Sequence, residues 1–130
     1  MLNLEIVTPE KNVVNETVDA VTLPGREGEL GILPGHAALI SGLKPGILSY
    51  TKGATTNKMV VAGGFVEISN DRVSVLADAA ETADQIDTTE ARAERDRVSA
   101  GMGNLSGEEL DDALDQIDRA EARLQLAAGR

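Results

Sequence analysis

Hydrophobic and polar residues alternate along the first part of the chain. In the segment LNLEIV, Leu2, Leu4 and Ile6 lie on one side of an extended backbone, with Asn and Glu between them. Alternation with a period of two predicts β-strands that are buried on one face. Further short runs of this kind are TVDAVTL, GILSYTK, KMVVAG, GFVEIS and RVSVLAD. Strands this short, separated by turns, predict an antiparallel β-sandwich or flattened barrel over residues 1–84.

Three proline-glycine pairs punctuate these runs, at Pro24-Gly25, Pro34-Gly35 and Pro45-Gly46. Proline fixes φ at the second position of a type II turn, and glycine accepts the positive φ that follows. We therefore expect all three pairs to turn the chain between strands. The pair Gly63-Gly64 instead lies inside a strand pattern, where glycine indicates a β-bulge or a close approach of two backbones.

Beyond the strand region the alternation gives way to a helical period, and two capping boxes mark where helices should begin. Asp87 is followed three residues later by Glu90, and Ser106 by Glu109. In a capping box the first side chain bonds an amide of the first turn, and the acid bonds back. The sequence AGMGN between the two segments supplies a helix stop and a turn. Residues 85–130 are therefore expected to form an antiparallel α-helical hairpin, a second domain.

The expected second helix ends near Ala128 and carries an apolar stripe spaced by three and four residues: Leu110, Ala113, Leu114, Ile117, Ala120, Leu124 and Ala127. The expected first helix, about Thr88 to Ala100, has only Ala91 and Val98 in comparable positions. Stripes this rich in alanine bury little apolar surface, and an isolated helix pair of this size is marginally stable. The hairpin must pack against the sheet domain or against another protein. It does so either in one fixed position or as a movable element, and the sequence leaves both open.

Charge and composition exclude several kinds of function. The 130 residues include 22 acidic and 12 basic side chains and no cysteine, and the formal net charge is -10. Affinity for nucleic acids comes mainly from Lys and Arg that neutralise phosphates, so no nucleic-acid partner is expected. Thiolate metal sites and thiol nucleophiles are excluded by the absence of cysteine. No apolar run approaches the roughly 18 residues that span a bilayer.

Candidate catalytic chemistry is sparse. His36 is the only histidine, and just past a turn its ring is expected to bond a nearby carbonyl rather than act as a general base. The stretch GREGELG lacks the lysine and the hydroxyl of a nucleotide P-loop, and the acidic run EELDDALDQID lacks the glycine turn of a calcium loop. We expect no catalytic residue and no metal site. A hydrolase that uses His36 and an acid remains an alternative.

An ordered set of motifs resembles the epsilon subunit of F-type, proton-translocating ATP synthases. The motifs are GELGILPGHAAL, LKPGIL, GGFVEI and VSVLADAAE, followed by a hairpin that ends in RAEARLQLA. The resemblance covers nearly the whole chain and implies a non-catalytic rotor subunit. It implies that the sandwich docks on the gamma subunit and touches the c-ring. The hairpin would rest on the sandwich, or extend along gamma toward the alpha/beta catalytic head and restrain ATP hydrolysis.

The same resemblance implies a location and a contact surface. The chain would be a peripheral membrane protein on the cytoplasmic face of a bacterial plasma membrane or, alternatively, on the stromal or cytoplasmic face of a thylakoid. Glu29, Leu30, Gly31 and His36 would form the loop that faces the c-ring, with Glu29 favoured over His36. A charged residue in an aliphatic turn suits the polar loops of a partner, and rigid corners lower the ordering cost of a torque-bearing contact.

Some members of the resembled family bind ATP between the folded helices through the pattern Ile-Asp-x-x-Arg-Ala. Ile86 and Asp87 match the start of this pattern, but Glu90 stands where the pattern has arginine. Arg92 lies two residues further on, about 200° around the helix, and points away from the required position. We therefore expect no cofactor. The alternative function is a nucleotide-sensing module in which ATP fixes the compact hairpin.

Two arginines of the second helix match the residues that complete that ATP site. Arg119 and Arg123 lie one turn apart, where both could meet a phosphate. The competing interpretation is that they form ion pairs with neighbours such as Asp115 and Glu90. Both interpretations remain open from the sequence.

The resemblance also implies inhibitory contacts between an extended hairpin and an acidic segment of the catalytic subunits. The candidate residues are Arg92, Arg95, Arg119 and Arg123. From Asp87 onward, however, six arginines accompany eleven carboxylates. Long-range attraction to an acidic target is therefore poor, and inhibition would depend on local arginine contacts on one face. We expect weaker or more conditional inhibition than in members with basic hairpins.

Overall fold

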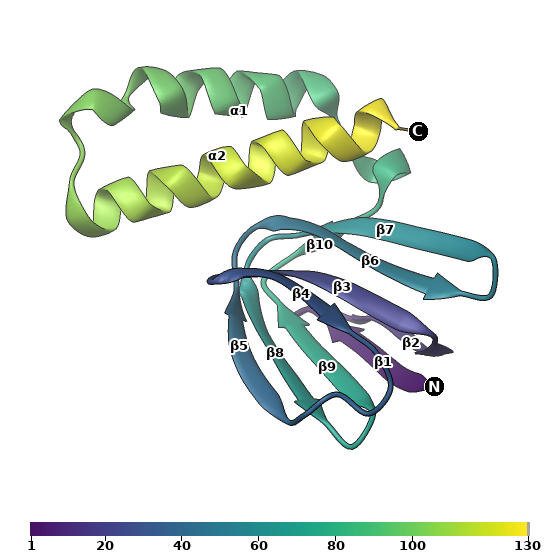
Figure 1. The fold of residues 1–130 in the computed structure, drawn as a ribbon. Coiled ribbons are helices and arrows are strands. Elements are labelled where there is room, and N and C mark those ends of the chain that lie inside the picture. Colours follow the sequence, from purple (N-terminus) through teal and green to yellow (C-terminus); the bar gives the residue numbers. More distant parts are fainter. Residues whose placement is uncertain (130) are drawn as a thin grey trace.

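The structure is a computed structural model that describes residues 1–129, and it consists of a β-barrel-like sandwich followed by two α-helices (Figure 1). The strands are β1 (Leu2–Val7), β2 (Asn12–Val18), β3 (Ala20–Gly25), β4 (Gly28–Ile32), β5 (Leu39–Leu43), β6 (Gly46–Lys52), β7 (Thr55–Val61), β8 (Gly64–Ser69), β9 (Arg72–Ala77) and β10 (Ala80–Glu81). The helical elements are the short 3-10 helices η1 (Ala83–Gln85) and η2 (Met102–Asn104) and the α-helices α1 (Thr88–Ala100) and α2 (Gly107–Ala128). Arg130, one of the six arginines counted in the hairpin, lies outside the described residues.

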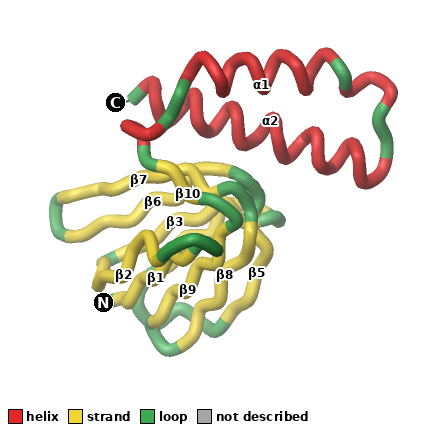
Figure 2. The backbone as a smooth tube through the Cα atoms, turned by 180° about the vertical axis from the view of Figure 1, so that it is seen from behind, coloured by secondary structure: helices red, strands yellow, loops and turns green. Residues whose placement is uncertain are grey.

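Hydrogen bonds join the strands in the order β10-β7-β6-β3-β5-β8-β9-β1-β2, and β4 pairs with β3. A single pair, Gly25 with Leu43, connects β3 to β5, so the path divides there into two layers. Figure 2 shows the strands of both layers wrapped around a common interior, with the helices on one side. The expected antiparallel sandwich is confirmed, with one parallel exception, the pairing of β1 with β9.

The interior of the sandwich is aliphatic, as the alternation predicts. Leu2, Leu4 and Ile6 of β1 are fully buried, and the neighbouring β9 buries Val73 and Val75. Because side chains alternate between the two faces of a strand, each of these strands gives one face to the core and the other to solvent. Full burial of one such side chain stabilises the fold by about 1.5–3 kcal/mol. The core of the sandwich also holds Val18, Val21, Leu23, Ile32, Leu43, Leu48, Tyr50, Met59, Val61, Val66, Ile68 and Ala77.

The segment TVDAVTL is not the single strand that its pattern predicts. The chain bends at Asp19, which separates β2 from β3, and both Val18 and Val21 are buried. The reason is a side-chain contact, since Asp19 Oδ2 accepts a hydrogen bond of 2.7 Å from the amide of Gly53 in the turn between β6 and β7. The Asp19 amide in turn donates to Thr51 O at 2.8 Å. A local period cannot reveal such a distant partner.

The prediction that all three proline-glycine pairs form type II corners is wrong for two of them. Only Gly35 has the required positive φ, of 85°. Pro24-Gly25 lies at the end of β3, where Gly25 pairs with Gly28 across a turn made by the two residues between them. Pro45 does lie between β5 and β6, but Gly46 already belongs to β6.

Gly64 occupies a place where two backbones meet, as its strand context predicts. A Cβ at this position would collide with the carbonyl oxygen of Leu76, and the residue has a φ of +104°. Any side chain would therefore push β8 away from β9. The preceding Gly63 also has a positive φ, of 85°.

The two expected helices form, but their caps differ from the predicted boxes. Asp87 caps α1 by accepting a hydrogen bond of 3.0 Å from the Glu90 amide. The Glu90 side chain does not bond back, because it pairs with a residue of α2. Ser106 takes the N-cap position of α2 without a side-chain cap, and the next residue, Gly107, has a left-handed φ of 59° where the box needs helical backbone.

Candidate functional site

The helical hairpin docks on one side of the sandwich through a small apolar seat. Figure 1 shows α2 lying between α1 and the barrel. The seat is a separate cluster in which Val60 of β7 and Ile86 of the linker meet Ala122, Leu126 and Ala127 of α2. Two of the three α2 residues are alanines, so the seat buries little apolar surface for a contact that holds a whole hairpin.

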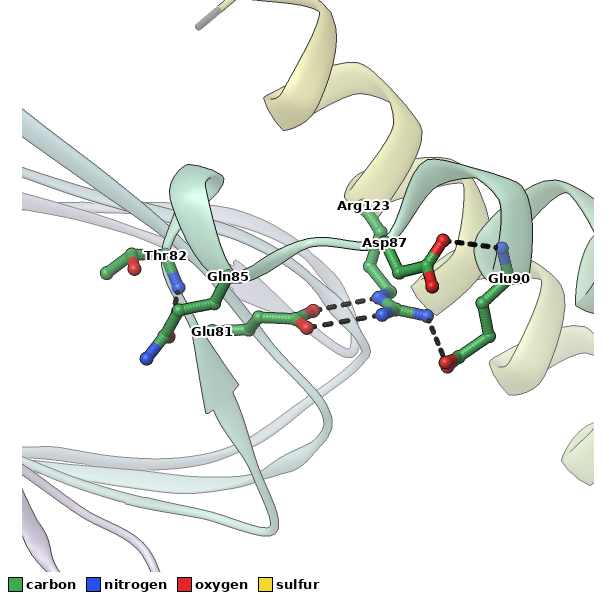
Figure 3. Close-up of polar contacts among 6 residues, drawn as sticks. All are labelled: Glu81, Thr82, Gln85, Asp87, Glu90 and Arg123. Carbon is green, nitrogen blue, oxygen red and sulfur yellow. Dashed lines mark hydrogen bonds and ion pairs between the residues drawn. The ribbon is translucent and has the colours of Figure 1, made fainter.

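A buried arginine completes this contact. Arg123 of α2 is only 4% exposed. Its Nε and Nη2 donate to the two carboxylate oxygens of Glu81, at 2.8 and 3.2 Å, and its Nη1 donates to Glu90 Oε1 at 3.2 Å (Figure 3). Glu81 lies in β10 and Glu90 in α1, so one guanidinium ties the barrel to both helices. We name these three residues the buried clasp.

The charges of the clasp keep Arg123 ionised despite its burial. Burial by itself disfavours the charged guanidinium, but the hydrogen bonds and negative charges of Glu81 and Glu90 outweigh it and raise the pKa of Arg123 above its usual value. Removing one partner of such a group leaves an uncompensated charge and costs about 3–5 kcal/mol when the pair is fully buried. The clasp therefore specifies the docked position much more sharply than the alanine-rich seat does.

A second ion pair ties the middle of α2 to the turn between β3 and β4. Arg26 Nη1 and Nη2 each donate to one carboxylate oxygen of Asp115, both at 2.8 Å. The pair is half-exposed, and its members together form the outer clasp. The hydrogen bond from Arg26 holds the pKa of the Asp115 carboxyl below its ordinary value of 3.8. Exposed pairs contribute only about 0–1 kcal/mol, so this clasp orients the hairpin more than it stabilises it.

The structure places three of the residues that match the nucleotide pattern close together, Ile86, Asp87 and Arg123, and directs the fourth, Arg119, to a different cleft. Ile86 is buried in the apolar seat and Asp87 caps α1. Arg119 lines a cleft of about 540 Å³ between α2 and the barrel, together with Arg26, whereas Arg123 is held in the buried clasp. The ion-pair interpretation is confirmed for Arg123 with Glu90.

Two residues of the clasps carry no signal in the sequence. Asp115, expected as a partner of the α2 arginines, pairs with Arg26 instead, 89 residues away. Glu81, which no motif singles out, is the principal partner of Arg123 at a separation of 42 residues. Local spacing shows neither partner, because only the docking of α2 on the barrel brings them together.

The residues expected in one ring-facing loop occupy different structures. Glu29, Leu30 and Gly31 belong to β4, not to a loop. Glu29 is exposed and lines a cleft of about 510 Å³ beside Asp118 and Glu121 of α2, whereas Leu30 is half-buried against the core. Among the described strands, β4 pairs only with β3, so its other edge is open.

His36 follows β4 in a turn and satisfies a nearby carbonyl, as expected. Its Nδ1 lies 2.7 Å from Ala37 O, and its amide donates to Leu33 O at 3.2 Å. Three residue steps of extended chain, roughly 10 Å, separate Glu29 from the carboxyl end of β4 at Ile32. The open edge of β4 thus leads from Glu29 to the turn that holds His36.

Docking of the hairpin sorts its arginines into two groups. Arg92 is exposed on α1, and Arg95, half-buried, pairs with the adjacent Asp96 at 3.2 Å. Arg119 faces the cleft toward the barrel, and Arg123 is buried. Within residues 1–129 no group of three or more His, Asp or Glu side chains could hold a metal ion. None of the described helices is long and apolar enough to cross a membrane.

Comparison with known proteins defines the class to which this fold belongs. A family model described as "ATP synthase, Delta/Epsilon chain, beta-sandwich domain" matches residues 1–83. A protein of Desulforamulus reducens named ATP synthase epsilon chain is 47% identical over 98% of this chain and 92% of its own length. The ATP synthase epsilon chain of Syntrophobacter fumaroxidans is 44% identical over 99% of this chain and 92% of its own length. The chain therefore belongs to the ATP synthase delta/epsilon family, among its epsilon chains.

Solved structures share the fold. A chain in the structure of the Euglena gracilis mitochondrial ATP synthase, OSCP/F1/c-ring, superimposes with a TM-score of 0.82 at 23% identity, covering 98% of this chain and 81% of that one. A chain of the Tetrahymena thermophila mitochondrial ATP synthase, central stalk/c-ring, gives a TM-score of 0.61 at 18% identity, covering 98% and 94%. At these identities the likeness concerns the arrangement of the barrel and the helices.

The substitution Glu81→Gln is expected to lower the free energy of opening of the docked hairpin by about 1–3 kcal/mol. The reason is that a neutral amide replaces the carboxylate that accepts two hydrogen bonds from Arg123. Native-state hydrogen exchange of the α2 amides measures this opening. Asp96→Asn is the matched control, since it removes a carboxylate from an exposed pair in the same hairpin. Equal α2 exchange in Glu81→Gln and wild type would show that the clasp does not hold the hairpin.

The outer clasp is expected to make docking sensitive to acid. Docking lowers the pKa of the Asp115 carboxyl from its ordinary value of 3.8. The contribution of the Asp115–Arg26 pair to the stability of the docked state is therefore complete above pH 3.8 and is lost as the pH falls through the lower docked pKa. The difference in α2 exchange between wild type and Asp115→Asn should therefore be constant near neutral pH and shrink as the pH falls below 3.8. A difference that persists unchanged in acid contradicts this assignment.

Proposed function

We propose that this chain is a non-catalytic central-stalk subunit of an F-type ATP synthase, which couples gamma to the c-ring during proton-driven ATP synthesis. The observation that carries the proposal is the likeness to epsilon chains over nearly the whole length of this chain. The chains that share its fold come from assemblies described as F1/c-ring and central stalk/c-ring. Its location would be peripheral, at the cytoplasmic face of a bacterial plasma membrane.

The outer face of β5, β8 and β9 suits the gamma contact. Ile40, Phe65 and Leu76 are exposed there by 70%, 45% and 45%, although all three are large and apolar. Phe65 pairs directly with Leu76, and Leu76 with Val7 of β1, so these side chains share one face of the sheet. Ile40 pairs with Glu67, so one charged side chain borders these exposed apolar residues. Exposed apolar clusters rimmed by polar residues mark interaction sites. We assign this face to gamma.

The open edge of β4 and the turn after it suit the c-ring contact. Glu29 is exposed at one end of this edge, and His36 lies beyond the other. A carboxylate and backbone groups without strand partners can meet the polar loops of a ring subunit by hydrogen bonding. Leu30, half-buried against the core, anchors this edge to the barrel.

The hairpin supplies the regulatory part of the proposal. In the docked state Arg123 is satisfied by two carboxylates and Arg119 faces the barrel. Release of the hairpin would free both residues and allow them, together with Arg92 and Arg95 of α1, to contact the alpha/beta head and restrain ATP hydrolysis. The net negative charge of the hairpin makes this restraint conditional on local contacts.

The nucleotide-sensing alternative is not favoured by the geometry. The guanidinium of Arg123 already donates to Glu81 and Glu90, and the Glu90 carboxylate beside it would repel a phosphate. The compact hairpin in this chain is therefore closed by its own carboxylates. We infer that it needs no nucleotide cofactor.

Charge reversal of Glu29 to Lys is expected to lower ATP-driven proton pumping by the assembled complex while ATP hydrolysis by the detached head stays unchanged, because the proposed ring contact is made by the barrel and not by the head. Pumping in membrane vesicles and hydrolysis in solution measure the two effects. Glu10→Lys is the control, since it makes the same charge change at another exposed site. Full pumping by Glu29→Lys refutes the assignment of this edge to the ring.

Deletion of the hairpin after Asp84 is expected to leave a folded barrel that still assembles with gamma, because the main core lies within the strands. ATP hydrolysis by the complex should rise, since the restraining element is gone. Circular dichroism of the shortened chain, co-purification with gamma and the hydrolysis rate measure the three outcomes. A rate equal to that of the full-length complex removes the regulatory role and leaves the coupling role.

A further inference from the structure

The turn between β8 and β9 holds its backbone in an unfavourable conformation. Ser69 pairs with Arg72, so Asn70 and Asp71 form a two-residue turn, and both have positive φ, of 51° and 62°. Turns of this kind prefer glycine at the second position, because other L-residues bring their Cβ close to the backbone there. Asp71 therefore occupies a position at which glycine would be relaxed. Strain that persists in a structure needs a compensating contact.

The compensating contact is a hydrogen bond to a neighbouring loop. Asp71 Oδ1 accepts the amide of Gly35 at 2.7 Å, and the Asp71 carbonyl accepts the amide of Asn3 at 2.8 Å. Gly35 has a φ of +85°, so the Pro34-Gly35 turn directs this amide outward from its own chain. Glycine in place of Asp71 would relieve the turn but would offer no carboxylate to Gly35.

The bonded loop, residues 33–38, depends on this contact for its position. It connects β4 to β5, and in Figures 1 and 2 it lies beside the β8–β9 turn, at the end of the barrel away from the helices. Its other hydrogen bonds are internal, between His36 and Leu33 and between His36 and Ala37. Across residues 1–129, the bond from Gly35 to Asp71 is the only one that joins this loop to another part of the barrel.

The loop also has the surface of a contact element. Leu33 is 63% exposed, although it is aliphatic, and the following proline and glycine are exposed too. An exposed apolar residue on a loop held by one bond gains binding strength when that loop is ordered in advance, because less conformational entropy is lost on association. A single carboxylate that fixes the loop would therefore affect the contact without touching the partner.

We propose that Asp71 is a positioning residue, whose carboxylate holds the loop 33–38 in the orientation that meets the c-ring. This inference rests on the proposed function, in which the edge of β4 and the turn after it face the ring. Aspartate tolerates the left-handed region better than most L-residues, and here its carboxylate also bonds the loop, which glycine could not do. The partner surface is a polar loop of the ring subunits, which receives Leu33 and the backbone groups beside it.

The test compares Asp71→Gly with Asp71→Asn in the full chain and in the assembled complex. Asp71→Gly relieves the backbone but removes the acceptor, so exchange of the Gly35 amide should accelerate about tenfold or more while the thermal midpoint does not fall. Proton pumping per ATP hydrolysed should drop about twofold. Asp71→Asn keeps an oxygen acceptor and should resemble wild type in both measurements. Asn70→Gly is the matched control, since it relieves the neighbouring residue and leaves the Gly35 bond intact.

Two results would overturn the inference. Unchanged exchange at Gly35 in Asp71→Gly means that the carboxylate does not hold the loop. Faster exchange with full pumping means that loop order does not matter to the ring contact. In that second case, Leu33→Asp distinguishes the positioning role of Asp71 from the assignment of the loop to the ring. A loss of pumping in Leu33→Asp keeps the ring-facing assignment and rejects only the positioning role of Asp71. Full pumping in Leu33→Asp rejects both.

Discussion

The docked form of this protein depends on one guanidinium that is buried among the carboxylates of two other elements. The apolar seat beneath α2 is small and rich in alanine, and it gives the helices little reason to prefer one orientation. Arg123 supplies that preference, because its fork can be satisfied only when β10, α1 and α2 lie in one arrangement. A buried pair of this kind is weak evidence for stability and better evidence for a specified geometry.

In the function proposed above, this constraint gives the hairpin two states, docked and released. In the docked state the buried guanidinium of Arg123 is satisfied inside the chain, and in any other state it must bond to water or another protein. Intermediate positions, with the arginine desolvated and unpaired, are unfavourable, so the hairpin changes position as a unit. The barrel does not share this property, because its aliphatic core is continuous and independent of the clasps. A rigid body with one movable attachment fits the proposed combination of coupling and control.

The sequence allowed the barrel and the helices to be predicted, because strand alternation, helix stripes and the Asp87 cap are local signals. It also indicated the close approach at Gly64 and the carbonyl partner of His36. The errors occurred where a distant contact overrode a local pattern: Asp19 bends a continuous strand to reach the turn at Gly53. The same limit hid Glu81 as the partner of Arg123. Period and spacing describe neighbours along the chain, whereas the clasps arise from packing across it.

The end of one sheet shows what else docking protects. β10 pairs with the outer edge of β7 at Val60 and Val61, and β7 also contacts α2 and η1, whereas its first residues, Thr55 and Thr56, are exposed. A sheet edge with unpaired amides recruits strands from other molecules, which leads to aggregation. In the docked state, α2 and η1 add contacts beside the end of β7 that β10 pairs with. Displacement of the hairpin would leave that strand with fewer neighbours, so the docked hairpin also limits strand addition from other chains.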